Sequence, residues 1–264
     1  MGTGSAGQPQ ANQTTTLTVA PINAKGQVIA DLQPLMGGEL LLVAMRYDLG
    51  WLQVQVAAPI PPDARGKRQF AVKFPQGGRH LLYFLFQPKG QPLAYVPVDL
   101  TVAGPDAPAQ AWVEEVPRFA GPDGLEVGLK TEPSAPAPCQ PFQVASTWLR
   151  RDKPLALLGG DRGRVLYLLL SEAMGSPVTS QAIAVQGDLA AEASAAAAGN
   201  PATAGSYRSL GADLGTDALL TANTSGHHKI LAIAATGTYA AAHVITAQFG
   251  LAVEGKLPPG GCPQ

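Results

Sequence analysis

Few residues of this chain carry side chains that commonly do chemistry. Its 264 residues include only four histidines and two cysteines. His227 and His228 are adjacent just before an expected strand, where neighbouring side chains point to opposite faces, so they cannot easily chelate one ion together. A metal site would need His243 to approach His228 across a hairpin, with a methionine as a further ligand for copper. We keep these three histidines as an alternative copper site, and our main interpretation has no metal or other cofactor.

Cys139 and Cys262 are the only cysteines of the chain. In an oxidising compartment they would form a disulfide that ties the early strands of the second half to the C-terminal tail. The alternative is two independent thiols. We favour the disulfide because the tail sequence LPPGGCPQ offers no other evident anchor. A blue-copper site at Cys139 would need two histidines and an axial ligand near it, and no Cys-x-His-x-Met cluster follows.

The remaining sequence gives catalysis little support. It contains no Gly-x-Ser-x-Gly elbow, phosphate-binding loop, dinucleotide fingerprint or His-Glu-x-x-His motif. The net charge is −1, and lysine and arginine are scattered, so we expect no nucleic-acid partner. No apolar run approaches the roughly 20 residues of a membrane-spanning helix, so we expect no transmembrane segment. Thirty glycines and 24 prolines indicate many turns and few long helices.

The elements that would position any site are strands. From residue 31 to residue 102, short apolar runs alternate with glycine, proline and charged residues about every ten positions, which is typical of an antiparallel sandwich. The expected strands in this first half are Leu17–Pro21, Gln27–Ala30, Glu39–Arg46, Trp51–Val56, Phe70–Phe74, His80–Phe86 and Leu93–Val102. Met36, Gly37 and Gly38 are expected to form a tight corner.

A looser copy of these signals follows in the second half. Its expected strands include Val165–Leu170, Ile230–Ile233, Tyr239–Phe249 and Leu251–Val253, with a turn at Ala235–Gly237. Residues 188–199 are alanine-rich, with Asp188 as an N-cap and Gly199 after the end, and predict a helix. We therefore predict an all-β fold with two tandem immunoglobulin-like β-sandwiches, the second carrying a partly helical, alanine-rich insertion.

The predicted domain boundaries follow from these elements. They are a disordered tail 1–16, a first sandwich 17–102, a linker 103–124, a second sandwich 125–256 with its insertion at 182–225, and a C-terminal tail 257–264. Trp112 and Phe119 are expected to pin the linker to a neighbouring surface. The N-terminal tract has no features of a signal peptide, and we read it as following a signal peptide that has been removed, in a periplasmic, secreted or cell-surface protein.

Several motifs resemble the YtkA-like domains, small immunoglobulin-like sandwiches of bacterial periplasmic and secreted proteins that are often linked to copper or other heavy metals. The similar segments are DLQPLMGG, GGRHLLYFLFQPKG, AYVPVDLTV, GLEVGLKTEPSAPAPCQPFQVASTWLRRDKPLALL and TGTYAAAHVITAQFGLAV. The resemblance implies the fold and an extracytoplasmic location. The family commonly carries a histidine after the Met-Gly corner and a His-x-His pair in the next hairpin. Leu41, Gln53 and Gln55 stand at these positions, Arg164 stands at the first of them in the second half, and an amide is a poor ligand for such metals.

Two predicted strands, Glu39–Arg46 and His80–Phe86, are apolar on both faces, although a free-standing sandwich presents polar residues outward. The linker, the second sandwich or another protein must cover the outer face. The interaction residues we select are Leu40, Leu42, Trp51, Gln53, Gln55, Leu81, Tyr83 and Leu85.

We therefore expect a non-enzymatic, extracytoplasmic binding or structural module, an accessory subunit of a cell-envelope assembly. It would bind a protein partner in the envelope or associate with itself. The alternatives are a periplasmic or secreted protein that binds copper or another heavy metal, and a metal-dependent redox enzyme such as a superoxide dismutase.

Overall fold

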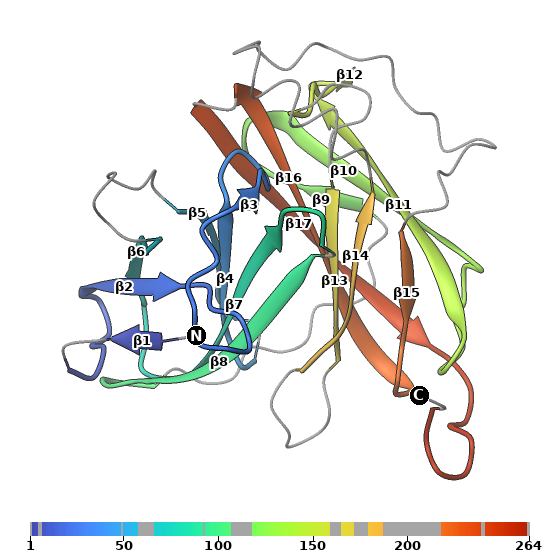
Figure 1. Ribbon diagram of the computed structural model, residues 1–264. Helices are drawn as coiled ribbons and strands as arrows, with labels where there is room; N and C mark the ends of the chain where they lie inside the picture. The colour runs from blue at the N-terminus through green and yellow to red at the C-terminus, as the bar shows by residue number, and fades with distance from the viewer. Residues whose placement is uncertain are drawn as a thin grey trace. The chain divides into compact units, whose positions relative to one another are not determined.

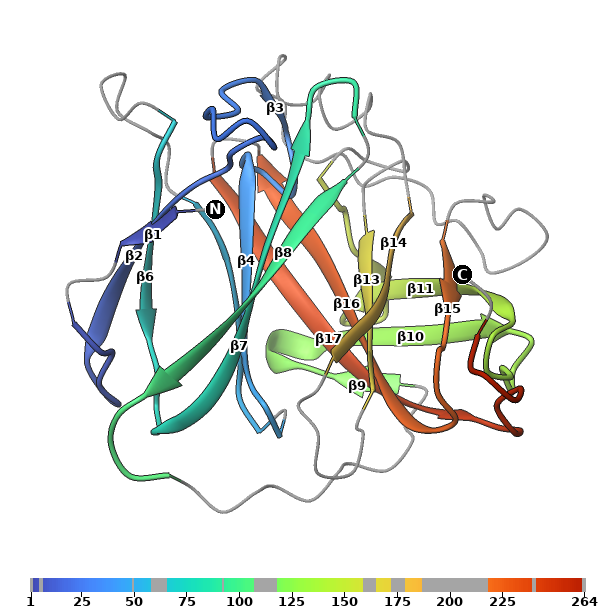
Figure 2. The same ribbon diagram turned by 60° about the horizontal axis from the view of Figure 1, so that its bottom comes forward.

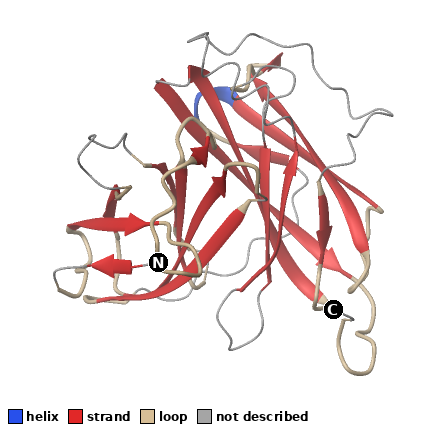
Figure 3. Cartoon of the chain, in the orientation of Figure 1, coloured by secondary structure: helices blue, strands red, loops and turns tan. Residues whose placement is uncertain are grey.

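The computed structural model describes residues 2–4, 7–48, 50–57, 66–91, 93–106, 118–158, 165–171, 179–186, 218–238 and 241–262. The chain folds as two compact units, Met1–Ala111 and Trp112–Gln264. The described part is almost entirely strand, with one short 3-10 helix, η1 (Pro122–Gly124) (Figure 3). In this part no helix has the length and apolar character needed to cross a bilayer.

The first unit contains two antiparallel sheets (Figure 1). The smaller sheet has the order β1-β2-β6, and the larger has the order β5-β4-β7-β8, with β3 added at the end of β7. The strands are β1 (Gly2–Gly4), β2 (Thr14–Ala20), β3 (Leu32–Gln33), β4 (Leu40–Arg46), β5 (Leu52–Val56), β6 (Arg68–Lys73), β7 (Gly78–Pro88) and β8 (Ala94–Val102).

The core of the first unit lies between these two sheets, because alternate residues of each strand point inward. Strand β6 shows the pattern clearly, with buried and exposed residues alternating along its whole length. Aromatic and aliphatic side chains from both sheets meet there: Leu17, Val19, Leu40, Leu42, Ala44, Phe70, Val72, Phe74, Leu82, Phe84 and Phe86.

Strand β4 departs from this alternation because all seven of its residues are buried. Leu41, Val43 and Met45 point away from the core between the sheets, yet their exposed fractions are 0%. On β7, Leu81, Tyr83 and Leu85 are buried in the same way. The central strand pair of the unit is thus withdrawn from water on both faces.

The predicted corner at Met36–Gly38 is confirmed. Leu35 and Gly38 exchange backbone hydrogen bonds, and the two residues between them, Met36 and Gly37, have φ values of 55° and 89°. Positive φ at both central positions is the geometry of a two-residue hairpin turn that matches the strand twist. The residue after the turn, Gly38, has no room for a side chain, because a Cβ there would lie 2.0 Å from the Val56 side chain.

The second unit repeats the plan. One sheet has the order β12-β11-β10-β9, with β15 pairing with β11, and the other has the order β14-β13-β16-β17. The strands of the two sheets cross in the view of Figure 2. The strands are β9 (Arg118–Ala120), β10 (Leu125–Glu132), β11 (Pro141–Arg150), β12 (Lys153–Pro154), β13 (Val165–Ser171), β14 (Thr179–Gln186), β15 (Leu219–Thr221), β16 (Gly226–Thr238) and β17 (Ala241–Val253).

The five-stranded sheet of the first unit and the four-stranded sheet of the second unit share the same order of four strands. In both, an edge strand, two central strands and a second edge strand follow in the same order, β5-β4-β7-β8 and β14-β13-β16-β17, and all neighbours are antiparallel. In β13, as in β4, every residue is buried. The prediction of an all-β fold with two tandem immunoglobulin-like sandwiches is confirmed.

Several predicted elements differ from the structure. Residues 27–30 form only an isolated bridge between Ile22 and Val28. The turn predicted at Ala235–Gly237 is wrong, because β16 continues to Thr238 and Gly237 still pairs with Ala242. The two strands predicted at 239–253 are the single strand β17.

The predicted linker and the predicted insertion both include residues that belong to strands. Phe119, expected in the linker, lies in β9 opposite Val127 of β10. The ends of the predicted insertion belong to β14 and β15. The predicted helix at 188–199 and Trp112 lie outside the described residues.

The predicted disulfide between Cys139 and Cys262 is confirmed. It joins the turn before β11 to the segment that follows β17, across 123 positions of sequence. The Cys139 N–H also donates to the Ala222 carbonyl at 2.8 Å, which connects the same turn to the residue after β15. The covalent tie therefore lies entirely within the second unit.

Replacing both cysteines with serine should lower the free energy of unfolding of the second unit by about 4–5 kcal/mol, because a closed loop of this length removes much entropy from the unfolded chain. Urea unfolding of the oxidised protein and the double variant, followed by Trp148 fluorescence, measures the difference. Adding a reductant to the double variant is the control and should have no effect. Equal urea midpoints for the two proteins would contradict the prediction.

Candidate functional site

A buried charge lies where β4 and β7 end together in the first unit. Arg46 is the cross-strand partner of His80, and its guanidinium is almost fully buried. Arg46 Nε and Nη2 donate to the two carboxylate oxygens of Asp48 at 2.8 Å and 2.7 Å, and Nη1 donates to Gln76. This paired geometry offsets much of the cost of removing a charge from water. Asp106, which is exposed, lies 3.6 Å from Nη2.

His80 is fully buried beside this ion pair. Its ring packs edge-on against Phe74 and Trp51, with centroids 5.0 Å and 5.7 Å away. Its Nδ1–H donates to the Gly78 carbonyl at 3.2 Å, and Nε2 has no hydrogen-bond partner among the described residues. Burial lowers the pKa of His80, and the charge of Arg46 lowers it further, against the opposing effects of the Gly78 carbonyl, Asp106 and Asp48. The imidazole is therefore held in its neutral form.

The second unit has the same arrangement. His228 is fully buried near the start of β16, and its Nδ1–H donates to the Gly226 carbonyl at 3.0 Å. Its Nε2 accepts from the Thr224 hydroxyl at 3.2 Å. Burial lowers the pKa of His228 as well, with a smaller contribution from His227, while the Gly226 carbonyl raises it.

The two histidines thus form a repeated motif, Gly-x-His, at the start of the equivalent strands β7 and β16. Gly78 and Gly226 have φ values of 96° and 105°, a region that glycine adopts without strain. Each positive φ directs the glycine carbonyl to the histidine two residues later. The sequence contains the signal, as Gly78-Arg79-His80 and Gly226-His227-His228, but our sequence analysis treated these histidines singly and missed it.

The alternative copper ligands do not come together. His228 is paired with Leu251 and His243 with Thr236, so they lie eight positions apart along the hairpin, a separation of about 26 Å. His227 and His243 are exposed, whereas both ring nitrogens of His228 are already bonded. Within the described ranges, no three histidine, cysteine, aspartate or glutamate residues gather so that they could hold a metal ion.

The interaction residues selected from the sequence lie in three places. Leu40 and Leu42 belong to the core between the sheets. Leu81, Tyr83 and Leu85 are buried on the opposite face of the larger sheet. On that face the ring centroids of Tyr83 and the half-exposed Tyr95 are 6.2 Å apart. Trp51, Gln53 and Gln55 lie at the edge of that sheet and are only partly buried.

We call Trp51 together with strand β5 the β5 rim. Among the residues that the structure describes, β5 pairs with β4 along one side and with no strand along the other, and all five of its residues are half-buried. Gln55 Nε2 donates to the Ala71 carbonyl of β6 at 2.7 Å and so links the two sheets. The ring of Trp51 packs against the ring of Phe74, with their centroids 5.6 Å apart, and this contact holds the Trp51 ring at the rim. The rim therefore combines an open strand edge with partly exposed apolar side chains.

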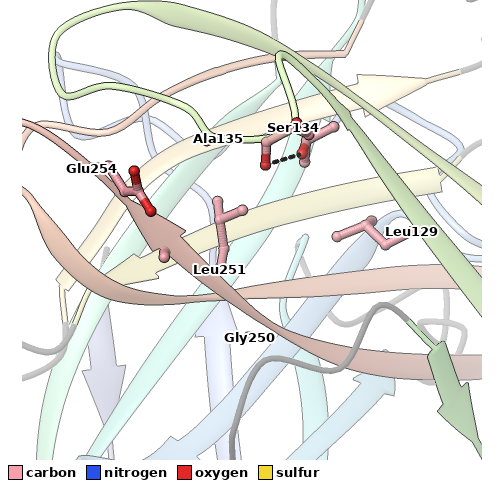
Figure 4. Close-up of a pocket in the computed structure, with 8 residues that line it drawn as sticks. Leu129, Ser134, Ala135, Gly250, Leu251 and Glu254 are labelled. Atoms are coloured by element: carbon pink, nitrogen blue, oxygen red, sulfur yellow. Dashed lines mark hydrogen bonds between the residues drawn. The ribbon is translucent and has the colours of Figure 1, made fainter.

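A groove of about 310 Å³ lies in the second unit (Figure 4). Strand β10 and the residues that follow it line one side, and the end of β17 lines the other. In Figure 4, Leu251 lies between Leu129 on one side and the Glu254 carboxylate on the other. The lining residues are Leu129, Thr131, Ser134, Ala135, Gly250, Leu251, Ala252 and Glu254. Sequence reasoning missed this groove, because no motif marks it.

No family model matches the chain, and no curated protein sequence matches it. Among solved structures, it is similar to a tetra-tandem repeat from the extending region of a large adhesion protein, with 12% identity and a TM-score of 0.28. It is also similar to the FN1–FN3 domains of chicken CNTN1, with 8% identity and a TM-score of 0.24. The matches cover 94% and 95% of this chain but only 48% and 66% of those proteins. The assignment of two immunoglobulin-like sandwiches rests on the strand order and register of the chain itself.

The buried histidines predict a specific loss of stability in acid. Because the folded pKa values of His80 and His228 lie below the ordinary value of 6.5, the unfolded chain binds more protons as the pH falls through 6.5. The contribution of the two neutral histidines to the free energy of unfolding is complete above pH 6.5 and is lost between pH 6.5 and their lower folded pKa values. Each histidine changes the free energy of unfolding by at most about 1.4 kcal/mol per pH unit.

Urea unfolding at pH 8, 7, 6 and 5 measures this slope. The His80→Gln, His228→Gln double variant should have a flatter profile between pH 7 and 5 than the native chain. The matched control is His243→Gln, which replaces an exposed histidine, leaves His80, His227 and His228 unchanged and should keep the native slope. Identical slopes in all three proteins would refute the assignment.

Proposed function

We propose that the chain is a non-enzymatic, extracytoplasmic module that binds another protein of a cell-envelope assembly through the β5 rim. The observation that carries the proposal is the open edge of β5. A sheet edge presents a row of backbone hydrogen-bonding groups, and proteins commonly recognise extended partners at such edges. The aromatic side chain of Trp51 and the amide of Gln53 would add contact area and specificity.

Several polar side chains of the first unit are hydrogen-bonded within the unit itself. Arg46 is held by Asp48 and Gln76, and the nearly buried Arg68 is bonded to Glu39. Gln55 is bonded to the opposite sheet. These side chains therefore have structural partners, and the open backbone edge of β5 is the feature that we assign to binding.

The extracytoplasmic location is part of the same proposal. The disulfide between Cys139 and Cys262 supports it, because structural disulfides persist mainly in oxidising compartments. Purified protein that carried near-stoichiometric copper or zinc by elemental analysis would count against the binding-module proposal and in favour of a metal-handling protein.

A crosslinking experiment tests the rim. A photo-reactive residue at position 53 should link the protein to one defined envelope polypeptide, which is then identified, purified and titrated against the native chain. Gln53→Arg should weaken that complex about tenfold, because it places a bulky charge in the centre of the contact. Gln69→Arg, the same change at an exposed residue of β6, is the matched control and should leave the affinity unchanged.

Equal affinities of the two variants would show that the partner binds elsewhere. Light scattering of the purified chain separates a second possibility. A dimer that Gln53→Arg dissociates, with no other polypeptide crosslinked, would replace the envelope partner with self-association.

A further inference from the structure

The end of β17 directs backbone groups to the groove of the second unit, and among the described residues no strand other than β16 pairs with it. Glu254, directly after β17, donates its N–H to the Pro136 carbonyl at 3.0 Å, away from β16. Alternate residues of an antiparallel strand direct both backbone groups to the same side, and the register between β16 and β17 has no irregularity. Gly250 and Ala252 therefore also direct their N–H and C=O groups away from β16, towards the groove that they line.

The end of β10 does the same from the other side. The Leu125 carbonyl accepts from the Gly121 N–H at 2.7 Å, on the edge away from β11. By the same alternation, Leu129 and Thr131 direct their backbone groups to this edge. Strand β9 covers the edge only as far as Gly128, which pairs with Arg118. In the described part of the chain, no strand pairs with Leu129 or Thr131 on this side.

The described part of β9 begins at Arg118, and the sequence makes a further pair with Leu129 unfavourable. If its register continued, residue 117 would be paired with Leu129 and would have to donate its N–H to the Leu129 carbonyl. Residue 117 is proline, which has no N–H and interrupts a strand ladder. A segment with a backbone N–H at that position suits the Leu129 edge better than one with proline.

The lining also defines the chemistry of such a segment. Leu129 and Leu251 provide an apolar floor, while Gly250, Ala252 and Ala135 leave room for side chains of the incoming strand. Glu254 is the only charged residue that lines the groove, and it has no ion-pair partner among the described residues. Its exposed carboxylate would attract a basic side chain.

We propose that the groove between β10 and β17 binds an extended segment of a partner protein, which adds as a strand to the edge of β17. The segment places small or medium apolar side chains against Leu129 and Leu251 and a lysine or arginine beside Glu254. This inference rests on the proposed function only in taking the chain to be a binding module, because the groove and the β5 rim lie in different units.

Fluorescence anisotropy with the full chain tests the proposal. The probe is a labelled nine-residue peptide of alternating threonine and valine with lysine at positions two and eight, so that either strand direction brings a lysine near Glu254. The expected result is saturable binding. A peptide with glutamate in place of both lysines should bind about tenfold more weakly, and one with proline at alternate positions should not bind, because it cannot donate to the edge.

Two substitutions locate the site. Ala252→Pro removes the N–H that faces the groove but none that pairs with β16, and should weaken the lysine peptide about tenfold. Thr246→Pro is the matched control, since residue 246 lies at an equivalent edge position of β17 outside the groove lining. Glu254→Lys should weaken the lysine peptide and strengthen the glutamate peptide, a reversal that a folding defect cannot produce.

Absence of binding by the native chain at about 1 mM peptide would overturn the inference, as would equal affinities of Ala252→Pro and Thr246→Pro. A dimer that Ala252→Pro dissociates, without peptide binding, would identify a second copy as the occupant and would also overturn it. These outcomes are independent of the crosslink at position 53, so a failure of the groove and a failure of the rim can be told apart.

Discussion

The fold depends on two strand pairs that avoid water on both faces. In the first unit β4 and β7, and in the second β13 and β16, carry apolar side chains on consecutive positions, and nearly all of these side chains are buried. Burial of apolar surface is the dominant favourable contribution to folding, so these central strands provide much of the driving force. The edge strands have a more mixed pattern, and the two surfaces discussed above both involve edges. The two proposed binding sites thus lie at edge strands, where fewer side chains need to be apolar.

Most of the buried polar residues in the described part lie at the ends of the central strands, with Arg68 of β6 as the exception. Arg46 and His80 end the buried part of β4 and β7, and Ser171 and His228 occupy the equivalent positions in β13 and β16. A buried polar group costs free energy unless it is hydrogen-bonded, and backbone carbonyls are accessible where a ladder ends. The repeated Gly-x-His motif meets this requirement for Nδ1 within three residues. Among the described residues, His80 Nε2 and Gln33 Oε1 are buried without a hydrogen-bond partner.

Much of the fold could be predicted from the sequence because periodicity records burial. Strands β4, β6, β8 and β13 were located within a few residues, since apolar runs bounded by turn residues have few other interpretations. The sequence predicts a turn at Ala235–Gly237 because a glycine usually marks a turn, whereas thirteen cross-strand pairs keep β16 in the ladder as far as Thr238. The groove could not be predicted, since it arises from the directions of backbone groups that every sequence possesses. The distance between His228 and His243 depends on the register of the β16–β17 hairpin. The turn of this hairpin was predicted too early, so that register could not be derived from the sequence.

The position of the disulfide has a mechanical consequence. Cys139 and Cys262 close a loop that contains most of the second sandwich, including β13, β16 and β17. When tension is applied on either side of this loop, the covalent bond carries the load and the residues within it carry none. The first sandwich contains no cysteine and has no such bypass. Only about half of the contour length of the chain is then available for stretching.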